Sequence, residues 1–423
     1  MRASALLLLT LFACSSAEED DERVGRLVGG TGPLPGAIRG VGYRSSSHSG
    51  VTDASGAFRY RAGEQVQFSV GALAFEKVSG AAFVSPFQLA NGSGCDAGDA
   101  LTRVLRALRS LDTDQSPDNG LTLPELPASE PPIRVGTLTD SELAAAVEAV
   151  SPGAKLIDAD LALEGFVRQI DDEEWTAEEG QSFLLPESAY RGQGVATDGK
   201  SWFFSSANHL QRADLAFQAV VNNEAPIPAD IFKLGGHHIG DIDVHEGRLF
   251  GSIENKPSFS HPYVVTYDAE TLELTGERWL LPQELHSKGV PWVAVDGPRR
   301  RVYTAEWDPT ERINVFDLDA DLALVKTIQL RSPIGRVQGA KVFGGRLYAS
   351  SDNENKSIYK IDLDTGVVIE LFTLGTPSSE SEGLALTRDD DGARVHVLNV
   401  VIPKVDFVVR RRTRDPLRDA ICP

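Results

Sequence analysis

The sequence predicts a mainly β protein with an N-terminal β-sandwich module, a short helical connector and a C-terminal β-propeller. Three observations support this prediction. Polar and apolar residues alternate between positions 57 and 70, apolar residues recur at helical spacing between 101 and 111, and a weak repeat fills roughly the last 240 positions. The 39 glycines and 23 prolines agree with a turn-rich β protein.

The composition is that of a globular protein with room for two or three domains. The chain has 423 residues, of which 41% are hydrophobic and 24% are charged. Lys and Arg number 41 against 61 Asp and Glu, which gives a formal net charge of -20. Nucleic-acid binding requires a basic surface, so we expect no nucleic-acid partner. The acidity is compatible with the attraction of cations.

The first 13 residues have the features of a secretory signal peptide. Arg2 precedes an apolar run from Ala5 to Ala13, which is too short to cross a bilayer as a helix. The sequence Leu11-Phe12-Ala13-Cys14 then resembles the bacterial lipobox. The resemblance implies lipidation of Cys14, a tether over residues 14–23, and an extracytoplasmic location in the bacterial cell envelope, on the outer membrane. The alternative is an ordinary secretory signal with an incidental cysteine.

Two further cysteines, Cys95 and Cys422, are available for oxidation outside the cytoplasm. A disulfide between them would connect the C-terminal tail to the N-terminal region. The alternative is a pair of unrelated thiols.

Residues 24–92 have the pattern of the β module. After a turn at Asp53–Gly56, Phe58 and Tyr60 alternate with polar residues, and Val66, Phe68 and Val70 repeat the alternation. The sequence TD-x-x-G-x-F-x-Y resembles carboxypeptidase-regulatory-like and related immunoglobulin-like modules of bacterial surface proteins. The resemblance implies a β-hairpin at this position and no catalytic site.

Residues 93–180 are expected to form the connector. Leu101, Val104, Leu105, Leu108 and Leu111 lie at helical spacing, which predicts a helix with one buried side. A Pro-rich linker follows at 124–133, and two short helices come after it. The run DDEEWTAEE (171–179) is interpreted as a solvated acidic boundary.

Residues 181–423 contain the repeat. Its inner strands are expected to begin near 194, 240, 292, 339 and 383, a spacing that fits four-stranded propeller blades. Outer strands are expected at DIFKLGG (230–236), GERWLLP (276–282), KTIQLRS (326–332) and ELFTLGT (370–376). Glycine recurs at the inner-strand starts because small residues fit where these strands crowd the axis.

The last repeat lacks a fourth strand, whereas QSFLLPE (181–187) precedes the first repeat unused. If this segment completes the last blade, the ring closes with five blades. Six blades remain the alternative if residues near 157–180 form another sheet. The region resembles bacterial extracytoplasmic propellers of the YncE-like, NHL and strictosidine-synthase-like families, which share an architecture without sharing one chemistry.

Loops before the inner strands and loops after the second strands are expected to share one face. These loops are rich in carboxylates and amides, which suit a hard cation such as Ca²⁺. The candidate metal ligands are Glu254, Asn255, Glu306, Asp352, Asn353 and Glu382. The candidate catalytic bases are His237 and His238, and the candidate ligand-binding residues are Gln193, Asp241, His261, Trp292 and Gln338. The alternative is that acidic and Asn residues simply populate exposed turns.

Two functional classes follow. The first is a lipid-anchored surface protein whose propeller binds a ligand or an envelope protein, with Ca²⁺ as the candidate cofactor. The second is a calcium-dependent propeller hydrolase or lyase that acts on a small ester or lactone. The chain contains no G-x-S-x-G elbow and no H-E-x-x-H motif, which favours the first class. The five arginines between 410 and 418 are interpreted as part of an exposed last strand.

Overall fold

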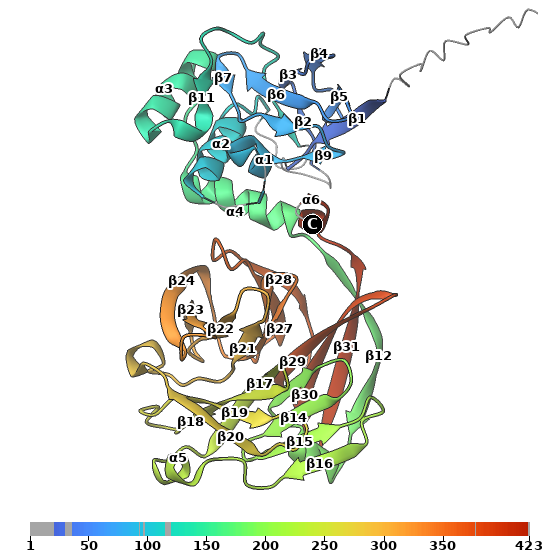
Figure 1. Cartoon of the computed structure of the whole chain (residues 1–423), viewed down its shortest axis with the longest axis vertical. Helices are drawn as coiled ribbons and strands as arrows, with labels where there is room; N and C mark the ends of the chain where they lie inside the picture. Colours follow the sequence, from blue (N-terminus) through green and yellow to red (C-terminus); the bar gives the residue numbers. More distant parts are fainter. Residues whose placement is uncertain are drawn as a thin grey trace, which may run out of the picture. The chain divides into compact units, whose positions relative to one another are not determined.

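The computed structural model describes residues 21–29, 36–92, 94–95, 98–114, 120–376 and 378–421. These residues form two compact units, one ending at Leu163 and the other running from Glu164 to Ile421. The boundary lies inside helix α4 (Ala159–Ile170), and each unit has its own set of elements (Figure 1). The domain boundaries expected from the sequence, at 92/93 and 180/181, stay predictions.

The first unit is built on two main β-sheets. One sheet has the order β5-β1-β9, and the other has the order β11-β7-β6-β3-β4 with β8 paired to β6. The strands are β1 Glu22–Leu27, β3 Gly42–Arg44, β4 Ser49–Val51, β5 Ala57–Arg61, β6 Gln65–Val70, β7 Leu73–Ala74, β8 Val78–Ser79, β9 Phe83–Val84 and β11 Ile133–Arg134; β2 Ile38–Arg39 pairs with β10 Leu121–Thr122. Phe58 of β5 meets Phe68 of β6 edge to face, with ring centroids 5.0 Å apart. The two sheets therefore share a core, as the alternating pattern predicted.

Helices complete the first unit: α1 Pro86–Asn91, α2 Asp99–Ser110, the 3₁₀ helix η1 Val135–Thr137, and α3 Asp140–Val150. The apolar stripe of α2 is buried as predicted, since Leu101, Val104 and Leu108 have no exposed surface. Helix α3 begins with a capping box, in which the Glu142 carboxylate accepts from Thr139 N and the Thr139 hydroxyl accepts from Glu142 N. None of the helices in the described ranges combines the length and apolar character needed to span a bilayer.

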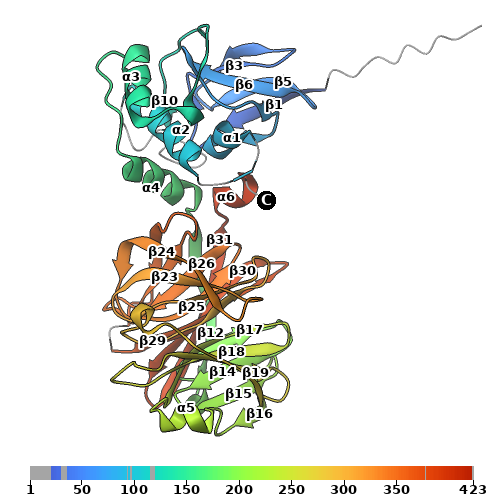
Figure 2. The same cartoon turned by 60° about the vertical axis from the view of Figure 1, so that its left-hand side comes forward.

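The second unit is a five-bladed β-propeller of four-stranded antiparallel sheets (Figures 1 and 2). Blade 1 has β13 Gly194–Thr197, β14 Trp202–Ser206, β15 His209–Ala213 and β16 Ala219–Asn223. Blade 2 has β17 His238–His245, β18 Arg248–Glu254, β19 Tyr263–Asp268 and β20 Leu274–Leu280. Blade 3 has β21 Ala294–Asp296, β22 Arg301–Thr304, β23 Thr310–Asp317 and β24 Ala323–Ile334. Blade 4 has β25 Val337–Phe343, β26 Arg346–Ser351, β27 Ser357–Ile361 and β28 Val368–Thr373.

Blade 5 closes the ring. It has β29 Glu380–Asp389, β30 Gly392–Val401 and β31 Lys404–Arg414, and its outer strand is β12 Glu174–Phe183 from the other end of the propeller sequence. Phe183 pairs with Val405 and Glu174 with Arg414 in an antiparallel register. The closure of blade 5 by a segment that precedes blade 1 is confirmed. Short helices η2 Glu187–Tyr190, α5 Ala229–Lys233, η3 Gln283–Leu285 and α6 Leu417–Ile421 complete the unit.

The five inner strands surround the axis in cyclic order, and β29 contacts β13. Glycine is required where they approach one another. A Cβ on Gly240 would lie 1.9 Å from the carbonyl oxygen of Pro291, and a Cβ on Gly339 would lie 2.6 Å from Cα of Gly383. These contacts confirm the expected role of small residues at the inner-strand starts.

Two interpretations of the sequence are corrected. Residues 230–236 were expected to be an outer strand, but α5 occupies residues 229–233. Pro228 stands at the N-cap of this helix, and Asp230 in its first turn interacts favourably with the helix dipole. The outer strand of blade 1 is β16 instead. The acidic run 171–179 was expected to be a solvated boundary, but β12 begins at Glu174, and Asp171 and Glu173 are both buried.

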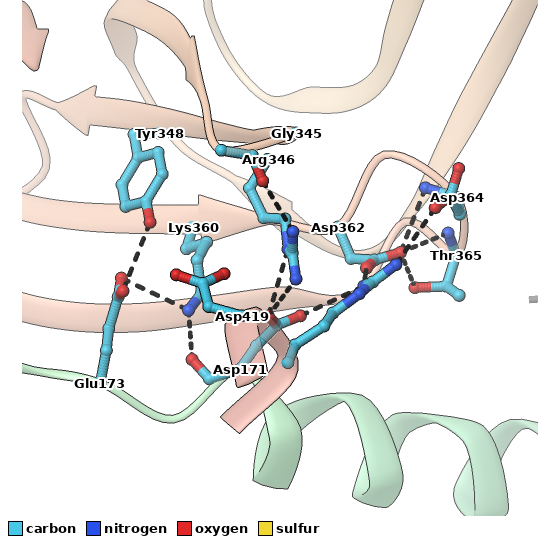
Figure 3. Close-up of polar contacts among 12 residues, drawn as sticks. Asp171, Glu173, Gly345, Arg346, Tyr348, Lys360, Asp362, Asp364, Thr365 and Asp419 are labelled. Carbon is cyan, nitrogen blue, oxygen red and sulfur yellow. Dashed lines mark hydrogen bonds and ion pairs between the residues drawn. The ribbon is translucent and has the colours of Figure 1, made fainter. Parts of the chain in front are cut away.

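The buried carboxylates are neutralised by cations of blades 4 and 5 and of α6. Figure 3 shows the blade 4 cations, Arg346 and Lys360, beside Asp171 and Glu173. Asp171 lies 2.9 Å from the Arg346 guanidinium, and Glu173 lies 3.3 Å from Lys360 Nζ and 3.2 Å from Arg412. The arginine-rich segment was expected to be part of an exposed last strand. Four of its arginines do lie in β31, which pairs with β12, but Arg412 of β31 and Arg418 of α6 are buried. The acidic and basic runs stabilise the ring closure together.

Candidate functional site

Polar residues gather on the propeller face that carries the loops before the inner strands and after the second strands. Antiparallel strands return the chain to this face twice in each blade, so the loops of different blades meet there. Glu254 ends the second strand of blade 2, and Glu306 and Asp352 lie in the loops after the second strands of blades 3 and 4. Glu382 is the third residue of inner strand β29.

Asp241 is buried at the axis with no exposed surface. Its carboxylate accepts hydrogen bonds from Val195 N at 3.0 Å and Ala340 N at 3.2 Å, and it lies 2.5 Å from Lys341 Nζ. Burial raises the pKa of Asp241 to about 6, although the charge of Lys341 opposes the change. The carboxylate therefore joins blades 1, 2 and 4 from within, and it is placed to stabilise the ring.

The two candidate amides, Asn255 and Asn353, form hydrogen bonds within their own loops. The Asn255 side chain donates to the hydroxyls of Ser258 and Ser260 at 2.9 Å and accepts from His261 N at 3.0 Å. Asn353 accepts from Ser357 N at 3.0 Å. The structure brings Asn255 and His261 together, but it uses their polar atoms within one loop.

Glu254 is the centre of a polar group in blade 2. Its carboxylate lies 3.2 Å from Nδ1 of His238 and 3.0 Å from Nζ of Lys256, and it accepts from Val290 N at 3.0 Å. Burial opposes ionisation of Glu254, but the contacts with His238 and Lys256 outweigh burial and hold its pKa below the ordinary value. Glu254 is thus an ionised carboxylate with its charge already compensated.

Asp352 has the equivalent position in blade 4. It pairs with Arg336, lies 2.7 Å from Nζ of Lys356, and accepts from Ser381 N at 3.1 Å. Arg336 and Lys256 both lie 5.8 Å from the ring centroid of Trp307, so the indole connects the groups of blades 2 and 4.

Glu382 differs from both of these carboxylates. Glu382 is 2% exposed, and its carboxyl group forms no hydrogen bond or ion pair with the described residues. Burial raises its pKa well above the ordinary value, and the negative charges of Glu380 and Asp352 act in the same direction. Lys256 opposes this effect. Glu382 is therefore a buried carboxyl group whose ionised form is disfavoured by burial and by neighbouring carboxylates.

The other candidates are dispersed. His237 is exposed and packs edge to face on Phe232 at 4.3 Å, and Trp292 is fully buried in the core between blades 3 and 4. Glu306 accepts from the Ser287 hydroxyl at 2.6 Å. Gln193 is half-buried before β13, Gln338 is half-buried within β25, and the Gln193 carbonyl accepts from Gly383 N at 2.7 Å.

Ca²⁺ prefers six to eight oxygen ligands, many of them carboxylates. Glu254 and Asp352 are paired with cations, and Asn255 and Asn353 are hydrogen-bonded within their loops. The described residues contain no group of three His, Cys, Asp or Glu side chains suited to a metal ion. This arrangement does not fit a Ca²⁺ site, and calcium binding stays a prediction.

Sequence reasoning missed the cations Lys256 and Arg336 and the indole of Trp307, because it searched these loops for oxygen ligands only. The signal was present, since Lys256 follows Glu254-Asn255 in the same loop. Cys95 is disulfide-bonded. The predicted signal peptide, Cys14 and Cys422 lie outside the described residues.

No protein-family model and no curated protein sequence matches the chain. Among solved structures, it is similar to a glutaminyl cyclase of Myxococcus xanthus, with 14% identity, a TM-score of 0.42, and coverage of 57% of this chain and 98% of the other. A gluconolactonase from Xanthomonas campestris has 15% identity, a TM-score of 0.35, and coverage of 57% and 96%. A luciferin-regenerating enzyme has 11% identity, a TM-score of 0.36, and coverage of 56% and 95%. At these values the likenesses assign no activity to this chain.

Proposed function

We propose that this chain is a lipid-anchored, extracytoplasmic binding protein whose propeller binds a small organic ammonium ion at Glu382. The observation that carries the proposal is the buried carboxyl group of Glu382, without a recorded partner in the described residues. Ionisation of a buried carboxyl without a counter-charge costs free energy, and a bound cation removes that cost. A ligand with a positive charge therefore gains the interaction that the protein itself does not supply.

The charges around Glu382 support a cationic ligand. Glu380, Asp352 and Asp241 all act to raise the pKa of Glu382, while Lys256 acts against them. Because Asp352 and Asp241 are paired with lysine or arginine, the negative potential at Glu382 comes mainly from Glu380, and it attracts cations. The net charge of the chain, -20, has the same sign.

An ammonium ion suits this position better than a metal ion. An ammonium group needs only a few hydrogen-bond acceptors, whereas Ca²⁺ needs at least six oxygens. The carboxylates of Glu254 and Asp352 are already paired with lysine or arginine, which leaves Glu382 as the free charge partner.

The experiment is a calorimetric titration of the protein with ethylamine, putrescine and CaCl₂ at pH 6 and pH 8. We expect the amines to bind, and to bind more strongly at pH 8, because a cation must displace the proton of Glu382. The Glu382→Gln variant should lose both the binding and its pH dependence, whereas Glu284→Gln, an exposed glutamate in η3, should retain both. Equal amine binding by Glu382→Gln would refute the proposal.

A second candidate function is acid–base hydrolysis or elimination on a small ester or lactone. The raised pKa of Glu382 favours it, because a carboxyl group that holds its proton to higher pH than usual can donate that proton to a leaving group. A panel of esters and lactones tested with the wild type and Glu382→Gln, with and without a chelator, decides between the two candidates. Turnover that Glu382→Gln abolishes would establish the enzyme, and chelator sensitivity would add calcium to it.

A further inference from the structure

The first unit contains a groove of about 850 Å³ that is separate from the propeller site. It runs along the sheet β11-β7-β6-β3-β4, with the segment 125–132 as one wall. Its volume lies within the range of sites that hold small ligands. The sequence pattern of this module indicated a hairpin and no site, so the groove is a finding of the structure alone.

The floor of the groove is one face of the sheet. Cross-strand partners point to the same face, and Gly42 pairs with Ser69, Arg44 with Gln67, and Ser69 with Ala74. All five of these residues line the groove. The neighbouring residues on the strands, such as Phe68, point to the core instead. Because Gly42, Ser69 and Ala74 are small, they leave space above the middle of the floor, while Arg44 and Gln67 make its sides polar.

The wall is held in place by the backbone. Ser129 N donates to the Gly71 carbonyl at 3.1 Å, and Ile133 N donates to the Ala72 carbonyl at 2.8 Å. Three of the residues between 125 and 132 are prolines, which fix the backbone and lower the entropy lost on binding. The groove is thus formed before any ligand arrives.

The charges of the groove balance. Arg44, Lys77 and Arg134 supply three positive charges, and three glutamates supply three negative ones. The glutamates are Glu76, Glu125 and Glu130. In a chain with a net charge of -20, this balance favours a ligand without charge.

The kind of hydrogen bond available favours a ligand rich in hydroxyl groups. The backbone groups of β3 and β6 pair with each other and with their neighbours, so they offer no ladder to an added peptide strand. The paired strands of the floor therefore offer hydrogen bonds through their side chains, and the groove mixes donors such as Arg44 with acceptors such as Glu125. A hydroxyl group both donates and accepts, so it matches either kind of side chain.

We propose that this groove binds a neutral oligosaccharide of two or three sugar units. A binding module of this kind would act independently of the propeller and does not depend on the ammonium site. The ligand class is set by the balanced charge, the polar side chains and the preformed wall.

The test measures the binding of defined probes to the full chain by saturation-transfer NMR and calorimetry. Cellotriose, maltotriose and triacetylchitotriose represent neutral glycans, trigalacturonate represents an acidic glycan, and trialanine represents a peptide. We expect at least one neutral trisaccharide to bind, and we expect Arg44→Ala or Glu125→Ala to weaken it about tenfold, the effect of one lost hydrogen bond to a charged group. Both residues are exposed, so the module should stay folded, and far-ultraviolet circular dichroism checks this.

Arg59→Ala is the matched control, because Arg59 is an exposed arginine on β5 in the other sheet. It should bind as the wild type does. Binding of trigalacturonate or trialanine alone, or of no probe, would overturn the proposal. So would neutral-glycan binding that neither groove substitution weakens.

Discussion

Replacement of Lys341 by methionine should make the stability of the propeller depend strongly on pH. Asp241 and Lys341 form a buried pair at the axis, with 0% and 6% of their side chains exposed. The rise in the pKa of Asp241 from 3.8 to about 6 corresponds to about 3 kcal/mol that ionisation costs the folded state. Because the folded state binds this proton more tightly, the group favours folding at low pH, and that contribution is lost as pH rises from 3.8 to about 6.

Without Lys341, the pKa of Asp241 rises further, since the lysine charge lowers it. At pH 8 Asp241 of the Lys341→Met variant must either remain an unpaired buried carboxylate or take up a proton, and both cost free energy. We expect a loss of about 3–5 kcal/mol in the free energy of unfolding. At pH 5 the carboxyl is largely neutral in both proteins, and the loss should be small.

Urea unfolding followed by tryptophan fluorescence gives the measurement. All five tryptophans lie between residues 175 and 307, so the signal reports the propeller alone. Lys326→Met, an exposed lysine on β24, is the control and should change little at either pH. A loss for Lys341→Met that is equal at pH 5 and pH 8 would show that the charge of Asp241 is not the cause.

Four further outcomes are expected. Gly240→Ala should cost about 3 kcal/mol or prevent ring closure, because its Cβ would lie 1.9 Å from a carbonyl oxygen, and the unfolding midpoint measures this. Lys360→Met should destabilise the propeller by about 3–5 kcal/mol in the same assay, since Glu173 loses a buried partner; an unchanged midpoint would contradict the closure argument. Burial lowers the pKa of His286 from 6.5 to about 4, so this group should reduce the stability of the propeller by about 3 kcal/mol as the pH falls from 6.5 to 4. His286→Gln should remove this part of the acid sensitivity. Cys14→Ser should abolish labelling by radioactive palmitate and release the protein from membranes, and persistent membrane attachment would count against the lipid anchor.

The ring was readable from the sequence because its requirements are local. Glycines at 194, 240, 339 and 383 and the alternating strands near them follow from crowding at the axis and from the period of a β-strand. The closing strand was also foreseen, since QSFLLPE had no partner in its own repeat. Its true start at Glu174 was missed, because the partners of Asp171 and Glu173 lie more than 170 residues further along the chain.

The site was harder to predict because residue type does not reveal which atoms are already satisfied. Asn255 and Asp352 have the chemistry of metal ligands, but loop hydrogen bonds occupy the first and two cations neutralise the second. Glu382 is recognised only when two facts are known together, its burial and the absence of a hydrogen-bond or ion-pair partner among the described residues. The acidic run at 171–179 and the basic run at 410–418 have opposite charges, which was a usable signal that they pair. The sequence interpretation treated the two runs separately.

The strand pair that closes blade 5 also sets the order in which the propeller can be completed. Arg412 contacts Glu173 across 239 residues of chain, so four blades can be made on the ribosome before the fifth has its sheet. Until β31 emerges, β12 has no neighbour, and its backbone groups are open to pairing with other chains. A chain of this design is therefore most prone to aggregation just before its last residues are made, and a truncation near the C-terminus should damage the whole ring and not one blade.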